Sequence, residues 1–148
     1  MTTTFDNPVL DVVRVFDAPP ERVFDAWMNK DQWEAWIGPE GCTCEITQFE
    51  PHVGGRYRLI MNLGEGRALP VVGTFKTIER PHRFAMSWGW ELGKGETLVT
   101  VSLRAVGART ELTLRHEGLP TRDDREGHAK GWNSTLNKLG LYLAGGTP

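Results

Sequence analysis

The chain has 148 residues, of which 39% are hydrophobic and 24% are charged, and its formal net charge is -2 at pH 7. These values fit one globular domain, residues 1–148 with a core of about 9–145, and they exclude a wholly disordered chain. No long run of lysine and arginine gives the electrostatic footprint of a nucleic-acid binder. The N-terminus, MTTTFDNPVL, lacks a basic leader and an apolar signal segment, and no run approaches the roughly 20 apolar residues of a membrane span, so we expect a cytoplasmic protein.

The first part of the chain predicts a strand followed by two short helices. Val9 to Phe16 is rich in β-branched residues and stops before a pair of prolines, which is typical of a strand end. Pro20 suits the first turn of a helix over Glu21 to Met28, and a second helical segment is expected over Asp31 to Trp36. Each short helix places large apolar side chains on one face.

The middle of the chain alternates apolar and polar residues between turn signals, and this pattern predicts antiparallel strands. Gly73 suggests a bulge within one of them. The expected strands are Thr43 to Phe49, Arg56 to Asn62, Ala68 to Glu79, Arg83 to Trp90, Glu96 to Ala105 and Thr110 to His116.

The sharpest alternation is RFAMSWGW, where Phe84, Met86, Trp88 and Trp90 share one face of a strand. These side chains can simply fill a core. Because the side chains of a single helix cannot reach every strand of a curved sheet, a cavity beside this aromatic wall is the other expectation. His116 continues an inward-facing row at the end of its own strand.

The last segment, Thr121 to Leu143, predicts a long amphipathic helix with His128, Trp132, Thr135, Leu136, Leu139 and Leu143 on one stripe. Thr121 with Asp124, or Asp123 with Glu126, can cap its start, and Gly145-Gly146 can end it. Gly127 and Gly131 inside the helix each cost roughly 0.5–1 kcal/mol relative to alanine. We expect both to allow close approach of a large neighbouring group.

Residues that could carry standard chemistry are few. The sequence has no H-E-x-x-H, G-x-S-x-G or phosphate-loop pattern. Cys42 and Cys44 are expected to be reduced packing residues, because His52 alone does not complete a metal site, and we expect no metal and no cofactor. His52 and His82 fall in turns and are expected on the surface, which leaves His116 and His128 as weak catalytic candidates.

Several segments together resemble a known family: PPERVFDAWMNKDQWEAWIGPEG, PHVGGRYR and GHAKGWNSTLNKLGLYL. They are similar to the helix-grip, START-like superfamily (SRPBCC), which includes the birch-pollen allergen, and most of all to the family named after the C-terminal domain of the activator of the 90-kDa heat-shock protein ATPase. The resemblance implies an α+β helix-grip fold, in which a seven-stranded antiparallel sheet wraps around the long C-terminal helix over an apolar cavity, with two short helices after the first strand. It implies no single activity, because members of the superfamily bind ligands, catalyse reactions or act as co-chaperones.

Three hypotheses follow. The leading one is that the protein binds or carries a small hydrophobic or aromatic ligand between the sheet and the C-terminal helix. The second is a cyclase- or hydrolase-like enzyme that uses His116 or His128 as a general base with a carboxylate such as Glu117 or Glu126. The third, suggested by the family name, is a co-chaperone-like interaction with a heat-shock ATPase. The predicted ligand-binding residues are Tyr57, Met86, Trp88, Trp90, His116, His128, Trp132 and Leu136.

Overall fold

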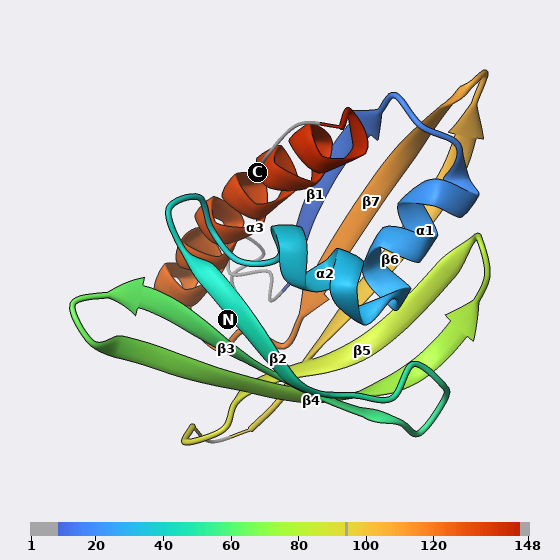
Figure 1. Ribbon diagram of the computed structural model, residues 1–148. Coiled ribbons are helices and arrows are strands. Elements are labelled where there is room, and N and C mark those ends of the chain that lie inside the picture. Colours follow the sequence, from blue (N-terminus) through green and yellow to red (C-terminus); the bar gives the residue numbers. More distant parts are fainter. Residues whose placement is uncertain (1–8, 94, 146–148) are drawn as a thin grey trace.

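A computed structural model describes residues 9–93 and 95–145 as one antiparallel sheet with three helices on the same side (Figure 1). The expected elements all form, with small shifts at their ends. In chain order they are β1 (Val9–Phe16), α1 (Pro20–Met28), α2 (Lys30–Trp36), β2 (Thr43–Phe49), β3 (Arg56–Gly64), β4 (Arg67–Glu79), β5 (Arg83–Trp90), β6 (Thr97–Val106), β7 (Arg109–Glu117) and α3 (Arg122–Leu143).

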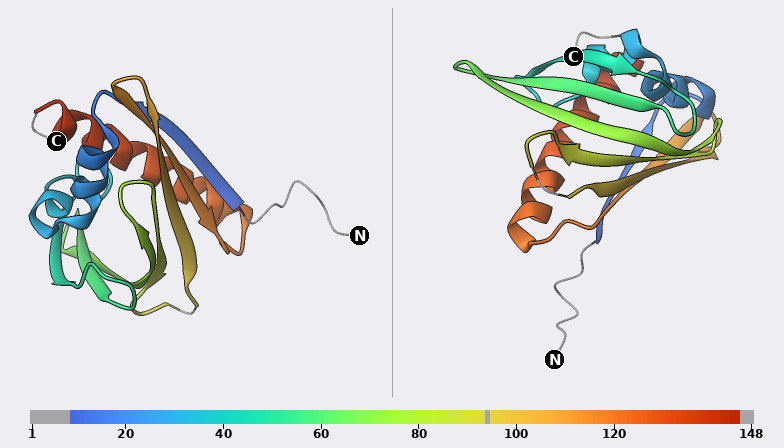
Figure 2. Two further views of the ribbon diagram at one scale, coloured as in Figure 1. Left: turned by 90° about the vertical axis from the view of Figure 1, so that its right-hand side faces the viewer. Right: turned by 90° about the horizontal axis from the view of Figure 1, so that it is seen from below.

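The sheet has seven strands in the order β1-β7-β6-β5-β4-β3-β2, and every neighbouring pair is antiparallel. Because β1 and β2 form opposite edges, the segment that joins them, which contains α1 and α2, crosses one face of the sheet. Two further views show the sheet curving around the helices (Figure 2). The predicted α+β helix-grip fold is confirmed.

The two short helices close one end of the concave face with aromatic side chains. Trp27 and Trp36 pack edge to face with ring centroids 4.7 Å apart, and the Trp36 indole N–H donates a hydrogen bond to the Ala26 carbonyl at 3.0 Å. Trp33 lies 5.3 Å from the Tyr57 ring. All three tryptophans are buried, so this end of the sheet is filled and any open space must lie towards the other end.

Gly73 serves a different purpose from the predicted bulge. It pairs in register with Tyr57, and the register of β4 and β5 shifts later, between Phe75 and Thr77. The Tyr57 hydroxyl passes Gly73 to donate a hydrogen bond to the Ser87 carbonyl at 2.6 Å, and a β-carbon on Gly73 would collide with both groups. Glycine is therefore required here by close approach.

Helix α3 begins with one of its two predicted caps and is anchored by its C-terminal half. The Thr121 side chain accepts a hydrogen bond from the Asp124 backbone N–H at 3.0 Å. Leu136 and Leu139 are fully buried. Gly145 has a left-handed backbone (φ 84°) just beyond the helix, as a C-terminal stop requires, whereas Gly146 lies outside the described residues.

Lys138 is buried on α3, although its charge argued against an inward position. Its Nζ donates hydrogen bonds to the Cys42 carbonyl at 3.1 Å and to the Ile37 carbonyl at 3.4 Å. These carbonyls belong to the loop between α2 and β2. The lysine therefore ties that loop to the helix.

Glu40, in the same loop, makes a second connection to α3. Its carboxylate accepts hydrogen bonds from the Ser134 hydroxyl at 3.0 Å and from the Asn137 amide at 3.2 Å, and its backbone N–H donates to the Ser134 oxygen at 2.7 Å. The hydrogen bonds from Asn137 and Ser134 lower the pKa of the Glu40 carboxyl. The loop between α2 and β2 is thus held against the middle of α3.

Candidate functional site: an aromatic cavity under helix α3

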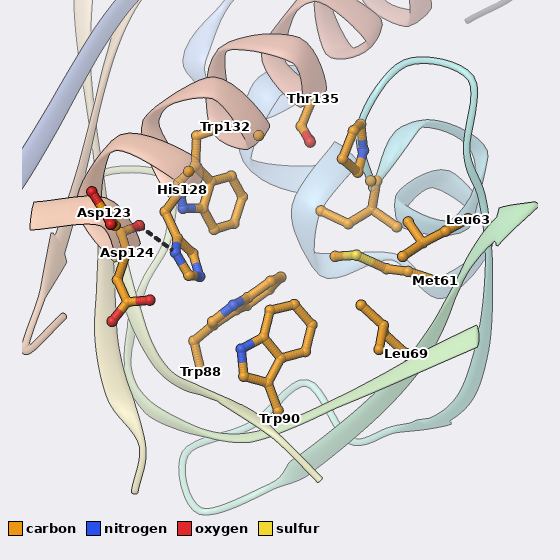
Figure 3. Close-up of a pocket in the computed structure, with 15 residues that line it drawn as sticks. Met61, Leu63, Leu69, Trp88, Trp90, Asp123, Asp124, His128, Trp132 and Thr135 are labelled. Carbon is orange, nitrogen blue, oxygen red and sulfur yellow. Dashed lines mark hydrogen bonds between the residues drawn. The ribbon is translucent and has the colours of Figure 1, made fainter. Parts of the chain in front are cut away.

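A cavity of about 370 Å³ lies between the N-terminal half of α3, the loop after α2 and strands β3 to β5. In Figure 3, Trp88, Trp90, His128 and Trp132 stand on one side of it, and Met61, Leu63 and Leu69 stand on the other. The full lining is Ile37, Gly38, Pro39, Met61, Leu63, Leu69, Trp88, Trp90, Asp123, Asp124, Gly127, His128, Gly131, Trp132 and Thr135. A volume of this size lies within the roughly 300–1,000 Å³ range of small-molecule sites.

Three tryptophans supply the aromatic part of the wall. Trp88 and Trp90 alternate on β5, and Trp132 faces them from α3, with the Trp88 and Trp132 rings 5.0 Å apart and tilted by 54°. Trp88 and Trp132 are buried, whereas 39% of Trp90 is exposed. Trp90 therefore stands at the rim, where a ligand would enter, and the other two form the inner wall.

Gly127 and Gly131 line the cavity from α3, and the expectation of a large group packed against them is wrong. A β-carbon built on either glycine meets no atom within 4 Å. The two residues are one helical turn apart, so their bare backbone leaves one continuous strip of the helix open. Two residues that weaken the helix thus enlarge the cavity.

His128 provides a polar group at the cavity wall with a defined tautomer. Its Nδ1 lies 2.8 Å from the Asp124 backbone carbonyl, the bond drawn in Figure 3. Because a carbonyl can only accept, Nδ1 carries the hydrogen, and in the neutral ring Nε2 then holds a lone pair. Within the described part of the chain, Nε2 has no hydrogen-bond partner.

His116 is fully buried at the end of β7, as its place in the inward row predicts. The Trp132 indole N–H donates to its Nδ1 at 3.0 Å, so its hydrogen is on Nε2, which donates to the Thr97 hydroxyl at 2.6 Å. Thr97 in turn donates to the Trp88 carbonyl at 2.8 Å. Each polar atom in this hydrogen-bond network, from the Trp132 indole to the Trp88 carbonyl, therefore has a partner.

The environment of His116 keeps its ring neutral. Burial, with a smaller contribution from the neighbouring His128 ring 5.0 Å away, lowers the pKa of His116 from its usual 6.5 to about 3. Neither ring nitrogen is free to accept a proton from a substrate. His116 therefore holds Trp132 and Thr97 in place and lies outside the cavity lining.

The structure brings half of the eight predicted ligand-binding residues to the cavity: Trp88, Trp90, His128 and Trp132. The other four, Tyr57, Met86, His116 and Leu136, are buried in the core outside its lining. Alternation identified the inward face of each strand, but it could not tell which inward positions the helices would cover. Tyr57, for example, lies beneath Trp33 of α2.

Sequence reasoning missed the lining that comes from loops and from the hairpin of β3 and β4. Leu63 and Leu69 flank the Gly64-to-Gly66 turn, and their apolar character beside a turn is a signal that could have pointed to them. Asp123 and Asp124 entered the prediction only as residues that could cap the last helix, yet both line the cavity.

Two further observations bear on the kind of site. Within residues 9–93 and 95–145, no group of histidine, cysteine, aspartate and glutamate side chains is arranged to hold a metal ion. No helix in the described part of the chain has both the length and the apolar character that a membrane crossing requires.

A curved seven-stranded sheet closed around a C-terminal helix, with an apolar cavity between them, defines a START-like helix-grip protein, and this fold fits a ligand-binding domain. More specifically, the chain belongs to the family described as activator of Hsp90 ATPase homolog 1-like protein, whose model matches residues 17–144. The resemblance seen in the sequence is therefore confirmed.

Solved bacterial structures agree with this assignment. A Rhodobacter sphaeroides protein is 30% identical with a TM-score of 0.81, and the match covers 93% of each chain. The AHSA1 protein from Silicibacter pomeroyi is 29% identical with a TM-score of 0.81, covering 92% of this chain and 97% of its own. A Chromobacterium violaceum protein, 24% identical over 90% of this chain and 94% of its own, shares the fold with a TM-score of 0.85. No curated protein matches the chain.

Proposed function

We propose that the protein binds or carries a small hydrophobic or aromatic molecule in the cavity under α3. The observation that carries the proposal is the pairing of an aromatic wall, Trp88, Trp90 and Trp132, with a helix face left open by Gly127 and Gly131. Glycines that serve only packing would be covered by neighbours, and these two are not. An apolar ligand would gain roughly 25 cal/mol for each Å² of apolar surface that it removes from water.

The predicted site residues take two roles in this proposal. Trp88, Trp90, Trp132 and His128 contact the ligand, whereas Tyr57, Met86, His116 and Leu136 hold the wall from behind. The hydrogen bond from Trp132 to His116 supports this division, because it fixes the orientation of an indole that the ligand would touch.

The alternative functions have less support. A catalytic role would have to use His128, since both ring nitrogens of His116 are engaged. The Nδ1 bond of His128 goes to a backbone carbonyl and not to Glu117 or Glu126. An interaction with a heat-shock ATPase rests on the family name alone. No observation favours either alternative over ligand binding.

The proposal is tested with the full chain by native mass spectrometry after mild purification and by titration with a panel of neutral aromatic and lipophilic compounds, followed by tryptophan fluorescence. We expect a retained apolar molecule or a saturable fluorescence change. Gly131→Phe fills the open strip of α3 and should abolish ligand binding.

The matched control is Gly140→Ala, which changes a glycine of the same helix that does not line the cavity. This variant should bind as the wild type does. Circular dichroism shows whether each variant is folded. Unchanged binding by a folded Gly131→Phe protein, or no response of the wild type to the whole panel, contradicts the proposal.

A further inference from the structure

His128 stands where two cavities meet. Beside the aromatic cavity lies a second one of about 420 Å³, bounded by the turn after β5 and the segment that leads into α3. The two linings share Trp88, Trp90, Asp124 and His128. A molecule bound on either side of this partition would therefore meet the imidazole edge of His128.

The free ring nitrogen of His128 is a hydrogen-bond acceptor. Nδ1 is committed to the Asp124 carbonyl as a donor, which leaves the Nε2 lone pair of the neutral ring. The carbonyl belongs to the preceding turn of the same helix, so ring and acceptor are fixed by one rigid element. His128 is half-buried, and its Nε2 has no partner among the described residues, so a ligand that donates a hydrogen bond to this atom gains one net bond.

The aspartate and glutamate residues of the two cavities outnumber the basic ones among the described lining residues. The acidic residues are Asp123 and Asp124 in the first lining and Glu96 and Asp124 in the second. Of the described residues, no lysine or arginine belongs to either lining. An anionic ligand would lose its hydration and gain no opposite charge from these described residues.

We infer that the ligand is an apolar molecule whose polar end is a hydrogen-bond donor, a hydroxyl or an amine, that bonds to Nε2 of His128, and that carboxylate ligands are rejected. This inference rests on the proposed function and adds the chemistry of the ligand's polar end. The ring system of the ligand packs against Trp88 and Trp132, and its donor points to the junction of the two cavities.

Three probes with the same ring system test the inference by isothermal titration calorimetry on the full chain: 2-naphthol, 2-methoxynaphthalene and 2-naphthoate. The wild type should bind the naphthol roughly 2- to 10-fold more tightly than the ether, as one net hydrogen bond allows. The naphthoate should bind more weakly than both. His128→Phe keeps a ring of similar shape, removes the acceptor, and should bring the naphthol and the ether to nearly equal affinity.

The control variant is His52→Phe, a histidine in an exposed turn outside both linings, and it should keep the wild-type order. The ¹⁵N resonance of His128 Nε2 gives an independent readout, because it should shift with the naphthol and not with the ether.

The outcomes separate the two proposals. Equal binding of naphthol and ether by the wild type, tightest binding of the naphthoate, or a preference that survives in His128→Phe would overturn the inference and leave the proposed function standing. Absence of binding by all three probes would overturn the inference, and the proposed function falls with it when the whole panel also gives no response.

Discussion

Trp132 and His116 are joined by a hydrogen bond of 3.0 Å from the indole Nε1 to the imidazole Nδ1, across the gap between α3 and β7. The bond connects a residue that lines the cavity to one that does not. It also requires His116 to stay neutral, because a proton on Nδ1 would leave two donors facing each other. The shape of the cavity wall is therefore coupled to the protonation state of a buried histidine.

This coupling predicts a loss of stability in acid. The folded-state pKa of His116 is lowered to about 3, whereas in the unfolded chain it is near 6.5, so below pH 6.5 the unfolded state binds the extra proton. The contribution of His116 to stability is complete above pH 6.5. It should fall by about 1.4 kcal/mol for each pH unit as the pH is lowered towards 3.

Urea denaturation at pH 7.5, 6.0 and 5.0 measures this slope. His116→Gln serves as the comparison, because its amide oxygen can still accept from Trp132 and it does not titrate. The variant should lose stability less steeply with falling pH than the wild type. Parallel curves for the two proteins would show that His116 titrates normally in the fold.

Substitutions at different positions of α3 should affect the stability of the protein and its ligand affinity to different degrees. Leu139 is fully buried and lies outside the cavity lining, so Leu139→Ala should lower the free energy of unfolding by about 2–5 kcal/mol and leave ligand affinity almost unchanged in the folded protein. Trp132→Leu should lower affinity beyond what its lost stability explains. Chemical denaturation and calorimetric titration of both variants provide the comparison. A similar loss of affinity in the two would indicate an ordinary core.

The glycines of α3 should show a gain in stability when they are replaced by alanine. Gly131→Ala meets no atom within 4 Å, so it should raise the free energy of unfolding by roughly 0.5–1 kcal/mol through better helix propensity. Gly140→Ala approaches the Phe16 ring at 3.6 Å, an ordinary contact distance, and should stabilise to a similar degree. Thermal and urea unfolding measure both variants.

Ligand affinity distinguishes these two substitutions, since only the first places a methyl group in the cavity. We expect weaker binding for Gly131→Ala and wild-type binding for Gly140→Ala. Destabilisation by Gly131→Ala would mean that the open strip is closed in solution.

The two cysteines should differ sharply in reactivity. Both are free; Cys44 is buried, and burial raises the pKa of its thiol to about 11, whereas Cys42 is half-buried. At pH 8 only about one Cys44 thiol in a thousand is ionised, and the thiolate is the form that reacts. Iodoacetamide should therefore modify Cys42 well before Cys44, as peptide mass spectrometry can follow. In Cys42→Ser, labelling should require a denaturant; rapid labelling of that folded variant would contradict the burial of Cys44.

The element order could be predicted from the sequence because each element carries its own local signal. The alternation in Arg83 to Trp90 and the stripe of α3 from Trp132 to Leu143 depend only on the geometry of one strand or one helix. The Thr121 cap and the inward position of His116 follow from the same local rules. The wrapping of the sheet around the long helix came from the family resemblance, which draws on segments from both ends of the chain.

Only the tertiary structure decided which inward residues face the cavity and which are covered. The sequence suggested close packing at Gly127 and Gly131, and they are open because no described group of another element lies against them. Tyr57 and Trp88 carry the same alternation signal, yet α2 covers the first and leaves the second beside the cavity. A cavity depends on how the helices and strands pack against each other. The sequence can therefore predict the inward face of each element without showing where two of these faces leave a gap.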